Sequence, residues 1–100
     1  MSDEDFDLIE DEIKVLEVLG NLNISNHKNI KENTIRKKLP SKYHKEFPDT
    51  IKSLRRKGLL KKYRKENYEL TKEGSRIAHE LADRLVKKLY SDLSKILLVL

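Results

Sequence analysis

The stretch KSLRRKGLLKKYRKENYELTKEG, residues 52–74, decides how this chain folds. Its many Lys and Arg residues are interrupted by Gly58, Leu59 and Leu60, and later by a Tyr-Glu-Leu-Thr run. Gly58 favours the end of a helix, because glycine adopts a backbone conformation that other residues resist. The runs at 59–64 and 67–71 are short, rich in Tyr, Leu and Thr, and almost contiguous, which predicts a tight β-hairpin. The stretch therefore predicts a helix, a hairpin and a second helix in succession.

An apolar stripe at steps of three and four residues precedes Gly58 and predicts one inward helical face. Pro48 fits best in the first turn of a helix, so we expect this helix over 48–57. Residues 41–46 are then expected to form a turn or a short separate helical turn. The stripe consists of Tyr43, Phe47, Ile51 and Leu54.

Helices are also predicted on both sides of this region. The apolar period of the N-terminal segment predicts a helix that begins at Ser2 and ends at Gly20, with acidic first turns that suit the helix dipole. Asn29 and Glu32 have the spacing of a capping box, which predicts a second helix ending at Leu39. Ile30 is a candidate for a short strand. From residue 72 the helical period returns for up to about 28 residues, with Thr71 as its cap.

The order of these elements resembles that of a winged helix-turn-helix domain. The likeness is carried by IKVLEVLGN, ENTIRKKL, DTIKSLRRKGLLKK and YELTKEGSRIA, and it covers roughly residues 6 to 80. Two features depart from the family pattern: the connection between Leu39 and Pro48 is longer, and the hairpin turn is very short. The resemblance implies a mainly α fold with a small β-hairpin (α+β). It also implies a winged domain over 1–74. We expect the helix over 75–100 to be a C-terminal dimerisation helix within the same compact unit.

Charge is distributed unevenly along the chain. Residues 1–12 hold seven acids and no base, whereas residues 13–100 hold 22 bases and ten acids. Between Arg36 and Lys65 there are 13 Lys or Arg against two acids. This density predicts a polyanionic partner, either nucleic acid or an anionic membrane surface. A basic surface that only keeps the protein soluble is the alternative.

The resemblance implies how such a chain would bind double-stranded DNA. The recognition helix, about 48–57, would enter the major groove, and the basic wing over 59–71 would contact the backbone. The candidates for base contact are Lys45, Asp49, Lys52, Ser53 and Arg56. The candidates for backbone contact are Lys42, His44, Arg55, Lys57, Lys61, Lys62, Arg64 and Lys65.

The C-terminal stripe is too apolar to be left in water on a domain of this size. It predicts a homodimer through the C-terminal helix. Packing within a single chain is the alternative. The candidate interface residues are Leu85, Leu89, Leu93, Ile96, Leu97 and Leu100.

Several classes of function are not expected. The chain has no cysteine, which excludes thiolate metal sites and a Cys nucleophile. His27, His44 and His79 lie in separate elements, and no phosphate-binding glycine loop or Ser-His-Asp order is present. The longest apolar run, 96–100, is far short of the roughly 20 residues that span a bilayer. We therefore expect no enzyme activity, cofactor, metal site or membrane partner.

The leading hypothesis is a sequence-specific, dimeric transcriptional regulator, cytoplasmic and associated with the nucleoid. The overall pattern resembles small archaeal regulators of this kind. Two alternatives stay open. One is a non-specific chromatin or architectural DNA-binding protein, and the other is a winged-helix module that binds proteins.

Overall fold

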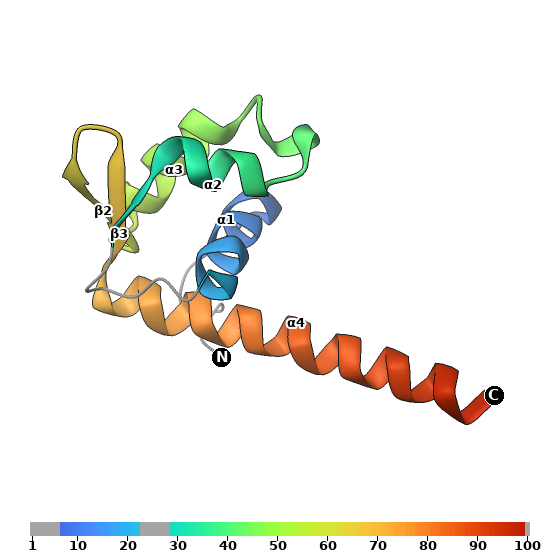
Figure 1. The fold of residues 1–100 in the computed structure, drawn as a ribbon. Helices are drawn as coiled ribbons and strands as arrows, with labels where there is room; N and C mark the ends of the chain where they lie inside the picture. The colour runs from blue at the N-terminus through green and yellow to red at the C-terminus, as the bar shows by residue number, and fades with distance from the viewer. Residues whose placement is uncertain (1–6, 23–28, 100) are drawn as a thin grey trace.

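The computed structural model describes residues 7–22 and 29–99, with side chains up to Lys95. The predicted cap at Ser2 and the histidine at position 27 lie outside these residues. The fold is mainly helical with a small antiparallel sheet, so the predicted α+β class is confirmed (Figure 1). Its elements are α1 (Glu10–Asn21), β1 (Asn29–Lys31), α2 (Glu32–Lys38), a 3-10 helix (Ser41–Tyr43), α3 (Phe47–Arg56), β2 (Leu60–Arg64), β3 (Asn67–Leu70) and α4 (Lys72–Val99).

The sheet has the order β1-β3-β2 and is antiparallel throughout. Tyr68 in the central strand lies opposite Ile30 on one side and Lys62 on the other. The predicted hairpin is confirmed, with a two-residue turn in which Glu66 has a positive φ of 67°. The short strand predicted at Ile30 is confirmed as well. Because β1 takes one side of β3, β2 is left as the free edge beside α3.

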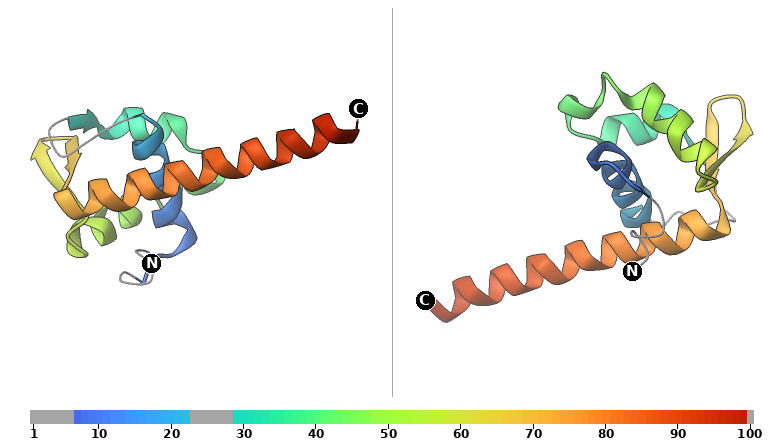
Figure 2. Two further views of the ribbon diagram at one scale, coloured as in Figure 1. Left: turned by 90° about the horizontal axis from the view of Figure 1, so that it is seen from below. Right: turned by 180° about the vertical axis from the view of Figure 1, so that it is seen from behind.

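The core is built from the inward faces of the helices and one face of the sheet. The predicted stripe of Tyr43, Phe47, Ile51 and Leu54 is buried throughout. Leu59 and Leu60 bring the start of the hairpin into the same core. Against them pack residues of α1 and α4, which cross in all three views (Figures 1 and 2). From these two helices the core takes Val15, Leu16, Leu19, Ile77, Ala78 and Leu81.

Helix α1 differs from the prediction at both ends. It begins at Glu10, where the Ile9 amide donates to Glu12 Oε1 at 3.0 Å and so satisfies a free N–H of the first turn. Gly20 does not end the helix, which continues to Asn21. A Cβ at position 20 would lie 2.3 Å from the Ala78 carbonyl oxygen. Gly20 is therefore required by the close crossing of α1 and α4.

The predicted capping box of α2 is wrong. Asn29 pairs with Glu69 in the sheet, and its side-chain oxygen accepts from Asn67 Nδ2 at 2.8 Å. The Glu32 amide instead donates to the Glu66 carbonyl at 2.7 Å, so the hairpin turn satisfies the start of α2. Pairing with the distant β3 strand thus overrides a local capping signal.

The boundaries around α3 agree closely with expectation. Pro48 lies in the first turn, and Gly58 ends the helical region with a φ of 76°. Thr71 Oγ1 accepts from the Gly74 amide at 3.0 Å, which confirms the predicted cap of α4. The same hydroxyl donates to the Gly58 carbonyl at 2.7 Å. Thr71 therefore ties the end of the α3 region to the start of α4.

Helix α4 has 28 residues, as predicted, and only its first half packs against the rest of the chain. Its second half extends away from the body of the molecule (Figures 1 and 2). None of the helices in the part of the chain that the structure describes combines the length and the apolarity needed to span a bilayer.

We expect Gly20→Ala to lower the free energy of unfolding by about 1–3 kcal/mol, because the added methyl forces α1 and α4 apart. Helix propensity alone predicts the opposite sign, a gain of about 1 kcal/mol. Urea denaturation followed by circular dichroism distinguishes the two. Asn21→Ala, at an exposed neighbouring position, is the control, and a stabilised Gly20→Ala variant would contradict the close crossing.

Candidate nucleic-acid interface

A shallow basic groove of about 480 Å³ lies between the C-terminal half of α3 and the strand β2. Gly58 reverses the chain after α3, so the free edge of β2 runs beside the helix that precedes it. Basic side chains from both elements therefore meet over one hollow. The groove is lined by Lys52, Arg55, Arg56, Leu60, Lys61 and Lys62.

Much of the positive charge in the basic groove is not neutralised within the protein. Among the described residues, four of the five basic side chains have no carboxylate partner, and all four are exposed: Lys52, Arg55, Arg56 and Lys62. Lys61 Nζ lies 3.2 Å from Glu69 Oε1, and Arg56 Nη2 donates to Ser53 Oγ at 3.3 Å. The groove therefore presents the kind of concentrated positive charge that attracts a phosphate backbone.

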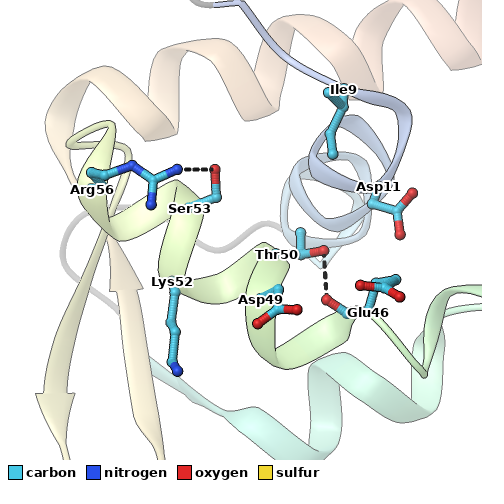
Figure 3. Close-up of a pocket in the computed structure, with 8 residues that line it drawn as sticks. All are labelled: Ile9, Asp11, Glu46, Asp49, Thr50, Lys52, Ser53 and Arg56. Atoms are coloured by element: carbon cyan, nitrogen blue, oxygen red, sulfur yellow. Dashed lines mark hydrogen bonds between the residues drawn. The ribbon is translucent and has the colours of Figure 1, made fainter.

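A second hollow, of about 430 Å³, lies between the start of α1 and the outer face of α3. Figure 3 shows the carboxylates of Asp11, Glu46 and Asp49 gathered at one side of it, with Lys52 and Arg56 placed further along α3. The outer face of α3 is thus acidic at its N-terminal end and basic at its C-terminal end. A phosphate backbone is favoured only at the basic end.

Glu12 lies at the centre of a hydrogen-bond network that joins α1 to α3. Its side chain is 1% exposed. Ser53 Oγ donates to Glu12 Oε2 at 2.5 Å, and Lys57 Nζ donates to Oε1 at 2.7 Å. Lys57 Nζ also donates to the Asp7 carbonyl at 2.7 Å. With the Ile9 amide, three donors converge on one buried carboxylate: one from α3, one from the residue that follows α3, and one from the segment before α1.

The network keeps Glu12 ionised. Burial by itself raises the pKa of a carboxyl group, but the hydrogen bonds from Lys57, Ser53 and the Ile9 amide outweigh it, and the pKa of Glu12 lies below its usual value of 4.5. A buried charge of this kind is tolerated because it is paired and fully hydrogen-bonded.

Two predicted DNA contacts, Ser53 and Lys57, are instead engaged in this network. The Ser53 hydroxyl, expected to face a base, donates to Glu12, and the Lys57 ammonium, expected to face phosphate, is held between Glu12 and Asp7. Both side chains are only partly exposed. Glu12 was not predicted as a functional residue, although its spacing of three, four and seven residues before Val15, Leu16 and Leu19 places it on the buried stripe.

The structure places other predicted contacts outside the basic groove, near the start of α1. Lys42 Nζ lies 3.7 Å from Glu10 Oε2, and His44 Nε2 is hydrogen-bonded to the Leu39 carbonyl at 2.9 Å. The Tyr43 hydroxyl donates to Glu10 Oε2 at 2.5 Å, which lowers the pKa of Glu10 and raises that of Tyr43. This end of α3 is therefore organised by contacts within the chain.

Three further predicted contacts also lie apart from the groove lining. Lys45 is exposed in the connection before α3. Arg64 and Lys65 are exposed at the far end of the hairpin, where the Arg64 guanidinium lies 5.3 Å from the centre of the Tyr63 ring. The predicted residues are thus divided. The basic groove is lined by Lys52, Arg55, Arg56, Lys61 and Lys62, and the second hollow is lined in part by Asp49, Lys52, Ser53 and Arg56.

The projecting half of α4 carries an apolar face with no partner among the described residues. Val86, Leu89, Tyr90 and Leu93 line a hollow of about 380 Å³, and their exposed fractions run from 47% to 71%. Of the predicted dimer residues, Leu85 is half-buried, while Leu89 and Leu93 belong to this face. The side chains of Ile96, Leu97 and Leu100 lie outside the described part of the structure.

Within residues 7–22 and 29–99, no group of His, Asp and Glu residues is arranged to hold a metal ion. Comparisons with protein-family models, with curated proteins and with solved structures find no match to this chain. The features of this chain that bear on its function are therefore the basic groove, the Glu12 network and the apolar face of α4.

We expect Glu12→Gln to lower the free energy of unfolding at neutral pH by roughly 2–4 kcal/mol, because Lys57 and Ser53 lose an ionised acceptor. The folded pKa of Glu12 is depressed, so its charge stabilises the fold above pH 4.5, and this contribution is lost as the pH falls through the folded pKa. Urea denaturation over a pH series measures both effects. The difference in free energy of unfolding between parent and variant should become smaller at acidic pH. A difference that is the same at every pH would contradict the role of the Glu12 charge.

Proposed function

We propose that this protein binds double-stranded DNA through the basic groove, as a homodimer with a winged-helix architecture. The simplest biological role for such a protein is that of a transcriptional regulator, acting in the cytoplasm at the nucleoid. The observation that carries the proposal is the convergence of five basic side chains from α3 and β2, four of which have no carboxylate partner in the described part of the chain. Concentrated, unneutralised positive charge of this kind attracts a polyanion such as a phosphate backbone.

The arrangement of the elements supports the winged-helix proposal. The helix α3 lies against a two-stranded hairpin, and a short strand before α2 completes the sheet. In this architecture α3 is the recognition helix and β2-β3 is the wing. The turn at Lys65 and Glu66 is short, so the wing contributes its basic flank at β2 more than a long tip.

Charge along α3 suggests how the duplex is oriented. Lys52 and Arg56 are the proposed base contacts, since Lys and Arg pair with guanine in the major groove. Arg55, Lys61 and Lys62 are the proposed phosphate contacts. Asp49, at the acidic end, suits only an amino group such as that of cytosine. Ser53 and Lys57 are left out of the proposed contact set because their donors are engaged with Glu12.

The apolar face of α4 supports the dimer. Val86, Leu89, Tyr90 and Leu93 follow steps of three and four residues, which is the spacing of a helix that packs on another helix. Most of the stability of a helix in a protein comes from packing of its apolar face. A second copy of α4 would cover this face in both chains at once.

Two alternatives are distinguished by binding measurements. A non-specific architectural protein is favoured by the small number of proposed base contacts, and a protein-interaction module is favoured by the exposed face of α4. The affinity for a random duplex is compared with the affinity for the DNA upstream of the protein's own coding region. A specific regulator should bind the upstream DNA more tightly, whereas an architectural protein should bind both equally. A protein-interaction module should bind neither duplex.

We expect Arg55→Gln combined with Lys62→Gln to make the salt dependence of duplex binding shallower by about two units of the log–log slope for each bound protomer, since each lost phosphate contact removes about one. Fluorescence anisotropy of a labelled duplex at several salt concentrations measures this slope.

The matched control for the groove variant is Lys37→Gln combined with Lys38→Gln. It removes the same charge from exposed positions in the last turn of α2 that do not line the groove. If both double variants change the slope equally, binding depends on overall charge, and the assignment of the groove is wrong.

We expect Leu89→Gln combined with Leu93→Gln to convert the dimer to a monomer, because each leucine contributes about 1.5–3 kcal/mol when buried. Sedimentation velocity measures the oligomeric state. Lys88→Gln with Ser91→Gln, on the same helix but outside the apolar hollow, should leave the dimer intact. A parent protein that sediments as a monomer at high concentration would rule out this interface.

A further inference from the structure

Ser53 connects the buried Glu12 network to the basic groove. Its Oγ donates to Glu12 Oε2 at 2.5 Å and accepts from Arg56 Nη2 at 3.3 Å. Figure 3 shows the Arg56 guanidinium turned toward the Ser53 hydroxyl. Arg56 lines both the basic groove and the hollow beside α1, so it stands at the boundary between them.

The direction of these hydrogen bonds follows from the chemistry of the three groups. A hydroxyl has one proton and two lone pairs, whereas an ionised carboxylate only accepts and a guanidinium only donates. Because Glu12 is held in its ionised form, the Ser53 proton must point at Glu12. The Ser53 lone pairs are then left for Arg56, and no other arrangement of the proton satisfies both neighbours.

Glu12 is itself held in place from two further sides. Lys57 Nζ and the Ile9 amide both donate to Oε1, so Oε2 remains available to Ser53. The carboxylate belongs to α1, while Ser53, Arg56 and Lys57 belong to α3 or its end. The orientation of the exposed arginine is thus linked to the packing of two helices.

We propose that Ser53 is a positioning residue, which uses the charge of Glu12 to hold Arg56 in the orientation that contacts nucleic acid. An arginine side chain loses rotamer entropy when it is fixed in one orientation, and a side chain that is already fixed loses less on binding. Only one guanidinium N–H is used by Ser53, so the remaining donors stay available for a phosphate or a guanine edge. This inference rests on the proposed function and adds to it a role for two residues that do not touch the DNA.

A double-mutant cycle tests the proposal with a labelled duplex as the probe. We expect Ser53→Ala to weaken duplex binding about threefold to tenfold, the effect of one hydrogen bond, without changing the slope of the salt dependence, because no charge is lost. Arg56→Gln should weaken binding and reduce the slope by about one unit. When Arg56 is already Gln, Ser53→Ala should have no further effect.

The conservative variant and a structural readout complete the design. Ser53→Thr keeps the hydroxyl and should restore most of the lost affinity. Because Ser53→Ala also removes a donor from Glu12, folding is checked by circular dichroism, and the mobility of the Arg56 Nε–H group is measured by NMR relaxation in the unbound protein. We expect that mobility to rise in Ser53→Ala and to stay low in Ser53→Thr.

Three results would overturn the proposal: an effect of Ser53→Ala that persists after Arg56→Gln, a failure of Ser53→Thr to restore binding, or an Arg56 mobility unchanged by Ser53→Ala. Failure of the proposed function is recognised separately. If Arg55→Gln with Lys62→Gln leaves the salt slope unchanged, the groove does not bind DNA. If that variant behaves as expected but Arg56→Gln has no effect, only the role of Ser53 and Arg56 is lost.

Discussion

The buried carboxylate of Glu12 is the interaction on which the orientation of α3 depends. It is 1% exposed, lies in the first turn of α1, and accepts from Ser53 and Lys57 at two successive turns of the α3 region. Burying a charge in this way is unfavourable unless every lone pair finds a donor. The requirement for donors therefore fixes how α3 is rotated about its axis, and apolar packing alone does not do so, because it tolerates small rotations.

That rotation determines which side chains of α3 are exposed. With Ser53 and Lys57 turned toward α1, Lys52, Arg55 and Arg56 face outward, beside the free edge of β2. The acidic residues at the start of α3 lie over a different hollow with Asp11. The separation of negative and positive charge along one helix follows from the sequence, but its placement relative to the hairpin follows from the network. Both are needed for the basic groove to lie beside the C-terminal end of α3, apart from the acidic residues at its N-terminal end.

Helix α4 combines two environments in one element. Gly20, Ala78 and Ala82 allow α1 to cross its first half closely, since a Cβ at position 20 would lie 2.9 Å from Ala82 Cβ. Beyond this crossing no described element covers the helix, and its apolar face is exposed. Small residues thus lie where α4 packs against α1 of the same chain. Larger apolar residues lie on the exposed part of α4, which is the proposed dimer interface.

Much of the fold is determined by the sequence itself, because it depends on interactions between residues close in the chain. The helical period around Phe47 and Ile51, the stop at Gly58, the hairpin over 59–71 and the cap at Thr71 all require only local geometry. The tertiary structure alone decided the features that join distant segments. Asn29 pairs with β3 in the sheet and does not cap a helix. Gly20 lies at the crossing of α1 and α4 and does not end α1. Ser53 and Lys57 bond to a carboxylate more than forty residues away in the sequence. The physical reason is that a polar side chain bonds whichever donor or acceptor the fold brings to it, and its type and local spacing do not specify a partner that is distant in the sequence.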